Sequence, residues 1–110
     1  KTGKVVGSFG IHDINFHRRT CEISYAISPS FWGEGVFMQS LKLALDSLIN
    51  EFHFYRITAV TSSNNIRSIN ALKKVGFKEE GVFRNFYFKD DDTRYNATPL
   101  ALLASEYIEL

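Results

Sequence analysis

The stretch TCEISYAISPSFWGEGV, residues 20–36, contains the pattern from which we predict the fold. Its first eight residues, 20–27, alternate between two faces, one of them apolar, and therefore predict a β-strand. Pro29 ends this strand because proline has no N–H group to donate to a sheet. Gly33 and Gly35 then allow a tight turn into a helix that we expect to run to about residue 52. The apolar stripe of this helix consists of Phe37, Leu41, Leu45, Leu48 and Phe52.

Patterns on both sides of this unit predict further elements. Residues 5–11 and 56–61 are short, apolar and rich in β-forming side chains, so each run predicts a strand. Asn65 has the position of an N-cap for a helix over residues 66–75. We expect Gly76 to end that helix in a left-handed conformation, with Phe77 packing back on Leu72.

Two runs near the C-terminus predict a hairpin. Residues 81–89 and 94–103 form its strands, and three aspartates at 90–92 form its solvated tip. Pro99 predicts that the second strand has a bulge or lies at an edge of the sheet. The order of elements is therefore β-β-α-β-α-β-β. It predicts one α/β domain over residues 1–110, with a mixed sheet and a right-handed crossover through the long helix.

The composition of the chain excludes several classes of protein. Its 110 residues are 45% hydrophobic and 15% aromatic, which suits one folded domain and not a disordered segment. A formal net charge of +1 gives no strong field for nucleic acid or an anionic membrane. No apolar stretch is long enough to span a bilayer. Cys21 is the only cysteine, so we expect a buried thiol, no internal disulfide and a cytoplasmic protein.

Neither the histidines nor the aspartate cluster predicts a metal site. The three histidines, His12, His17 and His53, lack the spacing of metal ligands. The aspartates at 90–92 lack the alternate ligands and the distal glutamate of a calcium loop. At the other end, Lys1 leads directly into a strand-like run, so we expect no signal peptide. Because no initiator methionine is present, we also expect the chain to be part of a longer protein.

The turn between the first predicted crossover strand and its helix has the features of an anion site. Ligands of open α/β sheets bind beyond the carboxyl ends of the strands, which is where Gly33 and Gly35 lie. Glycines allow the backbone to approach a ligand closely, and the first N–H groups of a helix have no partner within it. Together with the helix dipole these groups suit a pyrophosphate. The alternative is that the two glycines serve only the tight turn.

The same turn resembles the diphosphate loop of the GNAT superfamily of N-acetyltransferases. A second segment, residues 65–77 (NIRSINALKKVGF), is similar to the Asn-x-x-Ser helix start and the Gly-Phe helix end of the branch that acetylates alanine and serine N-termini of ribosomal proteins. Glu22-Ile23-Ser24-Tyr25 looks like the Glu-Ile-Gly-Tyr strand of that branch. The resemblance covers nearly the whole chain and implies a mixed sheet that is splayed open between the strands at 20–27 and 56–61.

The resemblance implies an enzyme that transfers an acetyl group from acetyl-CoA, its co-substrate, to a primary amine. The acceptor is left open between a protein N-terminus, a polyamine, an antibiotic and an amino acid, and a homo-oligomer is compatible with the family. Tyr25 and Ile27 would offer backbone groups to the pantetheine of CoA. The full set of implied cofactor residues is Tyr25, Ile27, Trp32, Gly33, Glu34, Gly35, Val36, Phe37, Asn65 and Ser68.

Two residues are candidates for proton transfer. Glu22 lies in the middle of a strand, opposite the apolar face, where its carboxylate could accept a proton from the acceptor amine. The alternative is a glutamate that only faces solvent. Ser68 is placed by the resemblance near the thioester sulfur, where it would protonate the leaving thiolate. The alternative for Asn65 and Ser68 is a helix cap, which is compatible with cofactor contact.

The chain also departs from the family pattern. Phe37 occupies a position that the family usually fills with a small residue, and the helical stripe favours a core position for it. Leu72 stands where many members carry a tyrosine acid, and the N-terminal elements of the family have no counterpart in this sequence. These departures leave two alternatives: a catalytically inactive CoA-binding or regulatory domain, and a structural fragment without a ligand.

Overall fold

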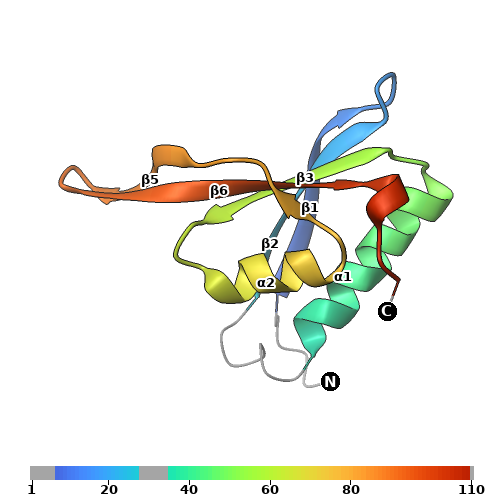
Figure 1. Cartoon of the computed structure of the whole chain (residues 1–110), viewed down its shortest axis with the longest axis horizontal. Coiled ribbons are helices and arrows are strands. Elements are labelled where there is room, and N and C mark those ends of the chain that lie inside the picture. Colours follow the sequence, from blue (N-terminus) through green and yellow to red (C-terminus); the bar gives the residue numbers. More distant parts are fainter. Residues whose placement is uncertain (1–6, 28–34, 110) are drawn as a thin grey trace.

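A computed structural model of the chain describes residues 7–27 and 35–109 (Figure 1). The fold is a mixed α/β sheet with two α-helices, as predicted. The strands run in the order β1-β2-β3-β6-β4, and β5 pairs with β6. Their bounds are β1 (Gly7–Asn15), β2 (Thr20–Ile27), β3 (Arg56–Ser62), β4 (Lys78–Glu79), β5 (Phe83–Asp90) and β6 (Thr93–Leu103). The helices are α1 (Val36–Asp46), which continues as the π-helical turn η2 (Ser47–Glu51), and α2 (Ile66–Lys74); a 3₁₀ turn, η3 (Ala104–Glu106), follows β6.

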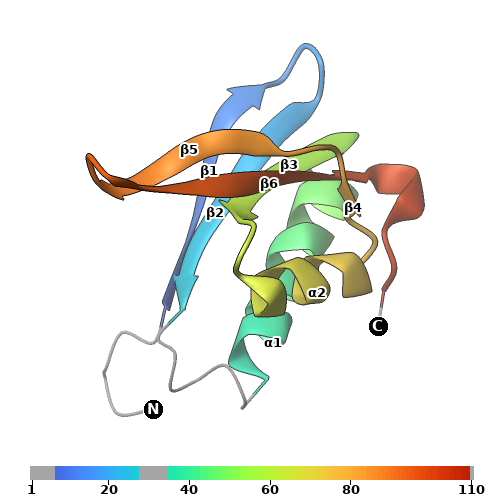
Figure 2. The ribbon, with the colours of Figure 1, turned by 60° about the vertical axis from the view of Figure 1, so that its left-hand side comes forward.

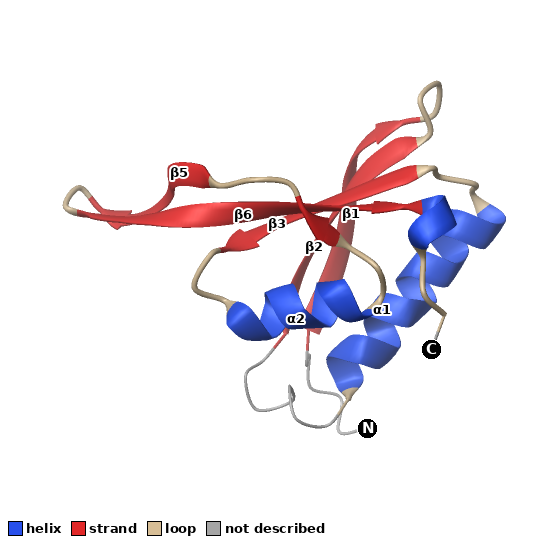
Figure 3. Cartoon of the chain, viewed as in Figure 1, coloured by secondary structure: helices blue, strands red, loops and turns tan. Residues whose placement is uncertain are grey.

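Both α-helices lie on the same side of the sheet, where they enclose one apolar core (Figure 3). Alternate residues of the central strands point into this core, which follows from the two-residue period of a strand. Cys21, Ile23, Ile57, Ala59, Leu100 and Leu102 are each 3% exposed or less. From α1 come Phe37, Leu41 and Leu45, and from α2 come Ile69 and Leu72. No helix in the described ranges is long and apolar enough to cross a membrane.

The end of the first helix differs from the prediction. Leu48 is buried as expected, but Phe52 is 52% exposed, so its assignment to the apolar stripe is wrong. The cause is the π-helical turn η2, which follows α1 and ends at Glu51, with Phe52 as its C-cap. A π turn contains more residues than an α turn, and it therefore rotates the residues after it away from the stripe. Phe54, which is 3% exposed, fills the core beyond this turn.

The ends of α2 follow the predicted local chemistry. The Asn65 side chain accepts a hydrogen bond from the Ser68 N–H group at 3.2 Å, which is an N-cap. At the other end the Phe77 N–H donates to the Leu72 carbonyl and the Gly76 N–H donates to the Lys73 carbonyl, both at 3.1 Å. Gly76 has a φ of 111°. This pair of bonds is the predicted Schellman ending.

The position of Pro99 corrects one expectation. β6 pairs with β3 on one side and with β4 and β5 on the other, so it is not an edge strand. The pairing on the second side is interrupted between Glu79 and Phe83. The Pro99 carbonyl accepts a hydrogen bond from Glu80 N–H on that side, and the nitrogen of the same residue faces the same way in an antiparallel ladder. The missing N–H group of Pro99 therefore falls at a gap in the pairing.

The sheet opens between β2 and β3. These parallel strands pair only from Thr20↔Arg56 to Glu22↔Thr58. Beyond that point β2 continues beside β1, while β3 continues beside β6, and the two halves of the sheet diverge (Figure 2). The predicted splay is therefore present, and it leaves an opening between β2, β3 and α2.

Candidate active site

A cavity of about 520 Å³ lies at the opening between β2 and β3. Its lining residues belong to β2, β3, the start of α2 and the β5–β6 hairpin. The lining residues are Tyr25, Val60, Thr61, Ser62, Asn64, Asn65, Tyr87 and Tyr95. The sequence-predicted residues Tyr25 and Asn65 are thus brought together, although 40 positions separate them in the chain.

The ring of Tyr25 packs against two phenylalanines, Phe9 and Phe37, which also stack on each other. Its centroid lies 4.7 Å from that of Phe37 and 5.5 Å from that of Phe9. These contacts fix the direction of the side chain, whose phenolic oxygen is hydrogen-bonded to the Ser68 hydroxyl on α2. Burial raises the pKa of Tyr25, the hydrogen bond with Ser68 acts in the opposite direction, and the charge of ionised Tyr87 raises it further. The phenol therefore stays protonated at neutral pH.

Ser68 is fully buried, at 0% exposure. Its N–H group donates to Asn65, and its hydroxyl is bonded to Tyr25. Ser68 is not among the residues that line the cavity. Its predicted role near the thioester sulfur is not tested by this arrangement, but any proton exchange with the cavity would have to pass through Tyr25 or follow a movement of that side chain.

Glu22 points away from the helices, on the opposite side of β2 from Cys21 and Ile23, as predicted. It lines a second cavity of about 280 Å³, together with Asp13, Arg18, Thr20, Cys21, Arg56 and Thr58. The structure therefore does not place Glu22 and Ser68 in one cavity. Its charge nevertheless reaches the larger cavity, because it raises the pKa of Tyr87, where burial is the main cause and Glu22 the second.

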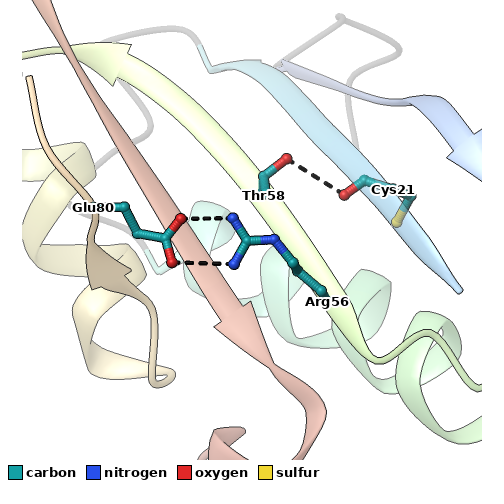
Figure 4. A network of polar contacts seen from close by, with 4 residues as sticks. All are labelled: Cys21, Arg56, Thr58 and Glu80. Carbon is teal, nitrogen blue, oxygen red and sulfur yellow. Dashed lines mark hydrogen bonds and ion pairs between the residues drawn. The ribbon is translucent and has the colours of Figure 1, made fainter. Parts of the chain in front are cut away.

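Neighbouring polar contacts hold this second cavity in shape (Figure 4). The Arg56 guanidinium donates two hydrogen bonds to the Glu80 carboxylate, at 2.6 and 3.1 Å. This pairing raises the pKa of Arg56 and lowers the pKa of Glu80, in both cases mainly through the hydrogen bonds. Thr58 donates to the Cys21 carbonyl at 3.5 Å across the last paired step of β2 and β3. On the β1 side, side-chain atoms of His12, Asp13 and Glu22 that could ligate a metal ion lie within 4.8 Å of one another.

Gly35 is the N-cap of the first helix, has a φ of 74° and is exposed. A Cβ atom at Gly35 would meet nothing within 4 Å, so the surface beside it is open. Val36 is the first residue of α1, and the Phe37 side chain is 1% exposed and packs in the core, as the stripe predicted. Trp32, Gly33 and Glu34 lie outside the described residues. The backbone of Ile27 pairs with Gly7 on β1.

A third cavity, of about 530 Å³, lies between α1 and α2. It is lined by Phe37, Met38, Ile66, Arg67, Asn70, Ala71 and Lys74. Arg67 and Lys74 are its basic lining residues. The cavity lies beside the start of α1 and extends along α2 from its first residue to its last. This cavity is not predictable from the sequence pattern, because it depends on how the two helices pack.

Several residues of the site were missed by sequence reasoning. Tyr87 and Tyr95 are direct partners in the β5–β6 ladder, and both line the cavity at the opening between β2 and β3. The signal that could have found them is the register of the hairpin, which the sequence pattern left unspecified. For Tyr25 only backbone contacts were predicted, and the hydrogen bond of its phenol with Ser68 was missed because the two residues are 43 positions apart.

Comparisons with known proteins agree with this arrangement. Residues 1–78 match the family model described as "Acetyltransferase (GNAT) domain". The chain is 26% identical over 106 residues to spermidine N(1)-acetyltransferase of Escherichia coli K12, covering 96% of this chain and 56% of that protein. It is 29% identical over 80 residues to the [ribosomal protein uS5]-alanine N-acetyltransferase of the same strain, covering 73% of this chain and 40% of that protein.

A solved structure shows the same fold. The dodecameric structure of spermidine N-acetyltransferase from Vibrio cholerae superposes with a TM-score of 0.83 at 22% identity, covering 93% of this chain and 59% of that one. The chain thus spans a little over half the length of these spermidine acetyltransferases. Because the family model matches 78 of the 110 residues, the chain belongs to the GNAT acetyltransferase family.

Proposed function

We propose that residues 1–110 form the acetyl-CoA-binding part of an N-acetyltransferase that transfers an acetyl group to a primary amine. The observation that supports this most is the opening of the sheet after Glu22 and Thr58, with a cavity of about 520 Å³ beside it. The described residues of β2 after Glu22 have no partner on β3. Backbone groups on that side can therefore pair with an extended ligand such as pantetheine, as an added strand would.

The start of α1 suits the diphosphate of CoA. N-terminal amides of a helix lack acceptors within the helix, and the dipole of the helix favours an anion there. Gly35 keeps the approach open, since no heavy atom lies within 4 Å of the position that its Cβ would occupy. The cavity between the helices, which Arg67, Asn70 and Lys74 line, lies next to this start and would take the nucleotide end of CoA.

Glu22 is the proposed base. Its carboxylate lies on the side of β2 that is away from the helices. Its charge contributes to the raised pKa of Tyr87, which lines the cavity. An acceptor amine that enters from that side would lose its proton to Glu22, directly or through a water molecule. Backbone N–H groups of β2 would polarise the thioester carbonyl. Correct placement of the two reactants can lower the activation barrier by about 7–11 kcal/mol.

We infer that the acceptor is a small cationic amine. Tyr25, Tyr87 and Tyr95 line the cavity, and aromatic faces attract ammonium groups. The similarity to spermidine acetyltransferases favours a polyamine over other amines. The similarity to the uS5-alanine N-acetyltransferase supports a protein N-terminus as the second candidate, and with it the ribosomal-protein branch of the family.

The test is acetyl transfer by the full-length protein with a panel of acceptors: spermidine, spermine, free amino acids and peptides with N-terminal alanine or serine. We expect turnover with at least one polyamine and weaker turnover with the peptides. Preference for the peptides would assign the chain to the N-terminal acetyltransferases. CoA binding without turnover on any acceptor would instead support a regulatory CoA-binding domain.

Assembly is a further part of the proposal. The related V. cholerae enzyme is described as dodecameric, and β1 ends the sheet with an edge that has no partner strand in the described part of this chain. Exposed strand edges are usually covered in native proteins. We therefore propose that a second copy, or another part of the same protein, covers β1, and sedimentation of the full-length protein measures its oligomeric state.

A further inference from the structure

We propose that the Tyr25 phenol is the acid that protonates the leaving thiolate of CoA, with Ser68 supporting it from α2. This inference rests on the proposed acetyl transfer. It assigns a chemical role to a side chain from β2, whereas the family resemblance placed only Ser68 or a helix tyrosine in that role.

The helix α2 lacks a proton donor that can reach the opening. Ser68 and Leu72 are four positions apart and therefore lie on one face of the helix. Both are 0% exposed. Leu72 carries no proton that could be transferred, and Ser68 is closed off from the cavity. This buried face of α2 thus offers no group that can give a proton directly to a ligand in the opening.

The position of Tyr25 favours this side chain as the donor. Its phenolic oxygen is bonded to Ser68, and the same side chain lines the open cavity. It is therefore the link between the buried hydroxyl and the space where the thioester would lie. Packing against Phe9 and Phe37 keeps the ring in this position without a bound ligand.

The acidity of the Tyr25 phenol also favours this residue as the proton donor. A phenol is a much stronger acid than an aliphatic alcohol, so Tyr25 is a better donor than Ser68. Burial raises its pKa, which keeps the proton in place until a basic thiolate forms. The Ser68 hydroxyl favours the phenolate by donating to it, because this hydrogen bond acts to lower the pKa of Tyr25. Ser68 is thus a positioning residue that also stabilises the conjugate base.

The proposed step balances as follows. The amine nitrogen, after losing one proton to Glu22 or water, forms a bond to the thioester carbon. When the carbon–sulfur bond breaks, its electron pair stays on sulfur, and Tyr25 gives its phenolic proton to that sulfur. The attack leaves the nitrogen with a positive charge and a second proton, which it releases to water as the carbon–sulfur bond breaks, so the products are the amide and the free thiol. The Tyr25 phenolate accepts a hydrogen bond from Ser68 and regains a proton from water through the open cavity.

The kinetic test compares two acetyl donors in the full-length protein. With acetyl-CoA, Tyr25→Phe should lower kcat by about 10²-fold or more, the usual effect of losing a general acid, while the dissociation constant of CoA stays unchanged. Ser68→Ala should cost only about tenfold, as the loss of one hydrogen bond does. With acetyl 4-nitrothiophenol, whose thiolate leaves without a proton, wild type and Tyr25→Phe should react at the same rate.

One further measurement does not depend on turnover. NMR titration of tyrosine labelled at the ring Cζ, with Tyr25→Phe for assignment, reports the ionisation of this phenol. Ser68→Ala should move it to higher pH, because the variant removes the contact that lowers the pKa of Tyr25. For the kinetic test, Tyr107→Phe is the matched control and should keep wild-type kcat, because its hydroxyl bonds Asp46 and neither residue lines the cavity.

Full activity of Tyr25→Phe with acetyl-CoA would overturn the inference and leave the proposed function intact. An equal loss in Ser68→Ala, rescued by the aryl thioester, would overturn it in favour of Ser68 as the donor. An equal loss with both donors would show that Tyr25 only shapes the site and would also overturn it. If the wild-type protein transferred acetyl from neither donor, the proposed function itself would fail.

Discussion

Glu22 and Thr58 form the last residue pair between β2 and β3, and beyond this pair the two strands separate. The Thr58 side chain secures the last paired step by donating to the Cys21 carbonyl at 3.5 Å. The pair therefore marks the point where the sheet opens toward the site that we propose for CoA. The carboxylate that we propose as the base stands at the apex of this opening.

Glu22→Gln should lower the rate of acetyl transfer and leave CoA binding intact. The variant keeps the shape of the side chain and removes the base, which typically costs about 10²–10⁴-fold in rate. Turnover across a pH series and the CoA dissociation constant should be measured on the same protein. Glu51→Gln, which removes an exposed carboxylate at the end of η2, is the matched control. Wild-type turnover of Glu22→Gln at every pH would make Glu22 a solvent-facing residue only.

Gly76→Ala should destabilise the fold strongly. A Cβ at Gly76 would lie 2.3 Å from the Glu106 carbonyl oxygen, and the φ of 111° is unfavourable for alanine. We expect a loss of more than about 2 kcal/mol in the free energy of unfolding, because the clash with backbone adds to the strain. Gly81→Ala is the control, since Gly81 has a φ of 144° but nothing within 4 Å of its Cβ position. Denaturant unfolding of both variants measures the difference; equal losses would contradict the role of the Glu106 contact.

Cys21 should be unreactive toward thiol reagents in the native protein. It is 3% exposed, and burial raises its pKa from 9.0 to about 11. Native labelling at mildly alkaline pH should be at least about 10²-fold slower than labelling in guanidinium, because the thiolate is both rare and covered. The pKa of Cys21 is higher in the folded protein than in the unfolded chain. The part of the folding stability that depends on a protonated Cys21 is therefore complete below the unfolded pKa and is lost as the pH rises through about 11. Equal labelling rates with and without denaturant would show that Cys21 is accessible.

Local chemistry was predictable from the sequence, whereas contacts between distant segments were not. The Asn65 cap, the Gly76 ending and the return of Phe77 depend on neighbours within a few residues, and each was predicted. The exposure of Phe52 was not, because the sequence pattern assumes a regular helix and η2 breaks that period. Long-range packing, such as the bond between Tyr25 and Ser68, depends on a register that periodicity does not specify.

The same division applies to the candidate site. Glu22, Tyr25 and Asn65 could be named as candidates because they belong to short segments that carry the family resemblance, and their roles stay predictions. Tyr87 and Tyr95 reach the cavity only through the pairing of β5 with β6, and Arg67 and Lys74 reach theirs only through the packing of α2 on α1. Residues of these two groups can be assigned only once the tertiary structure is known.

The central claim is that CoA binds at the start of α1 and in the opening beside β2. Calorimetric titration of CoA into the wild type, Gly35→Val and Gly81→Val tests it most directly. Both variants place a branched side chain at a glycine of positive φ, but only Gly35 lies at the proposed diphosphate site. We predict one CoA per chain for the wild type, the same affinity for Gly81→Val, and at least about tenfold weaker binding for Gly35→Val, equal to a loss of about 1.4 kcal/mol. A folded wild type that releases no heat with CoA, or a Gly35→Val variant of unchanged affinity that circular dichroism shows to be folded, would contradict the claim.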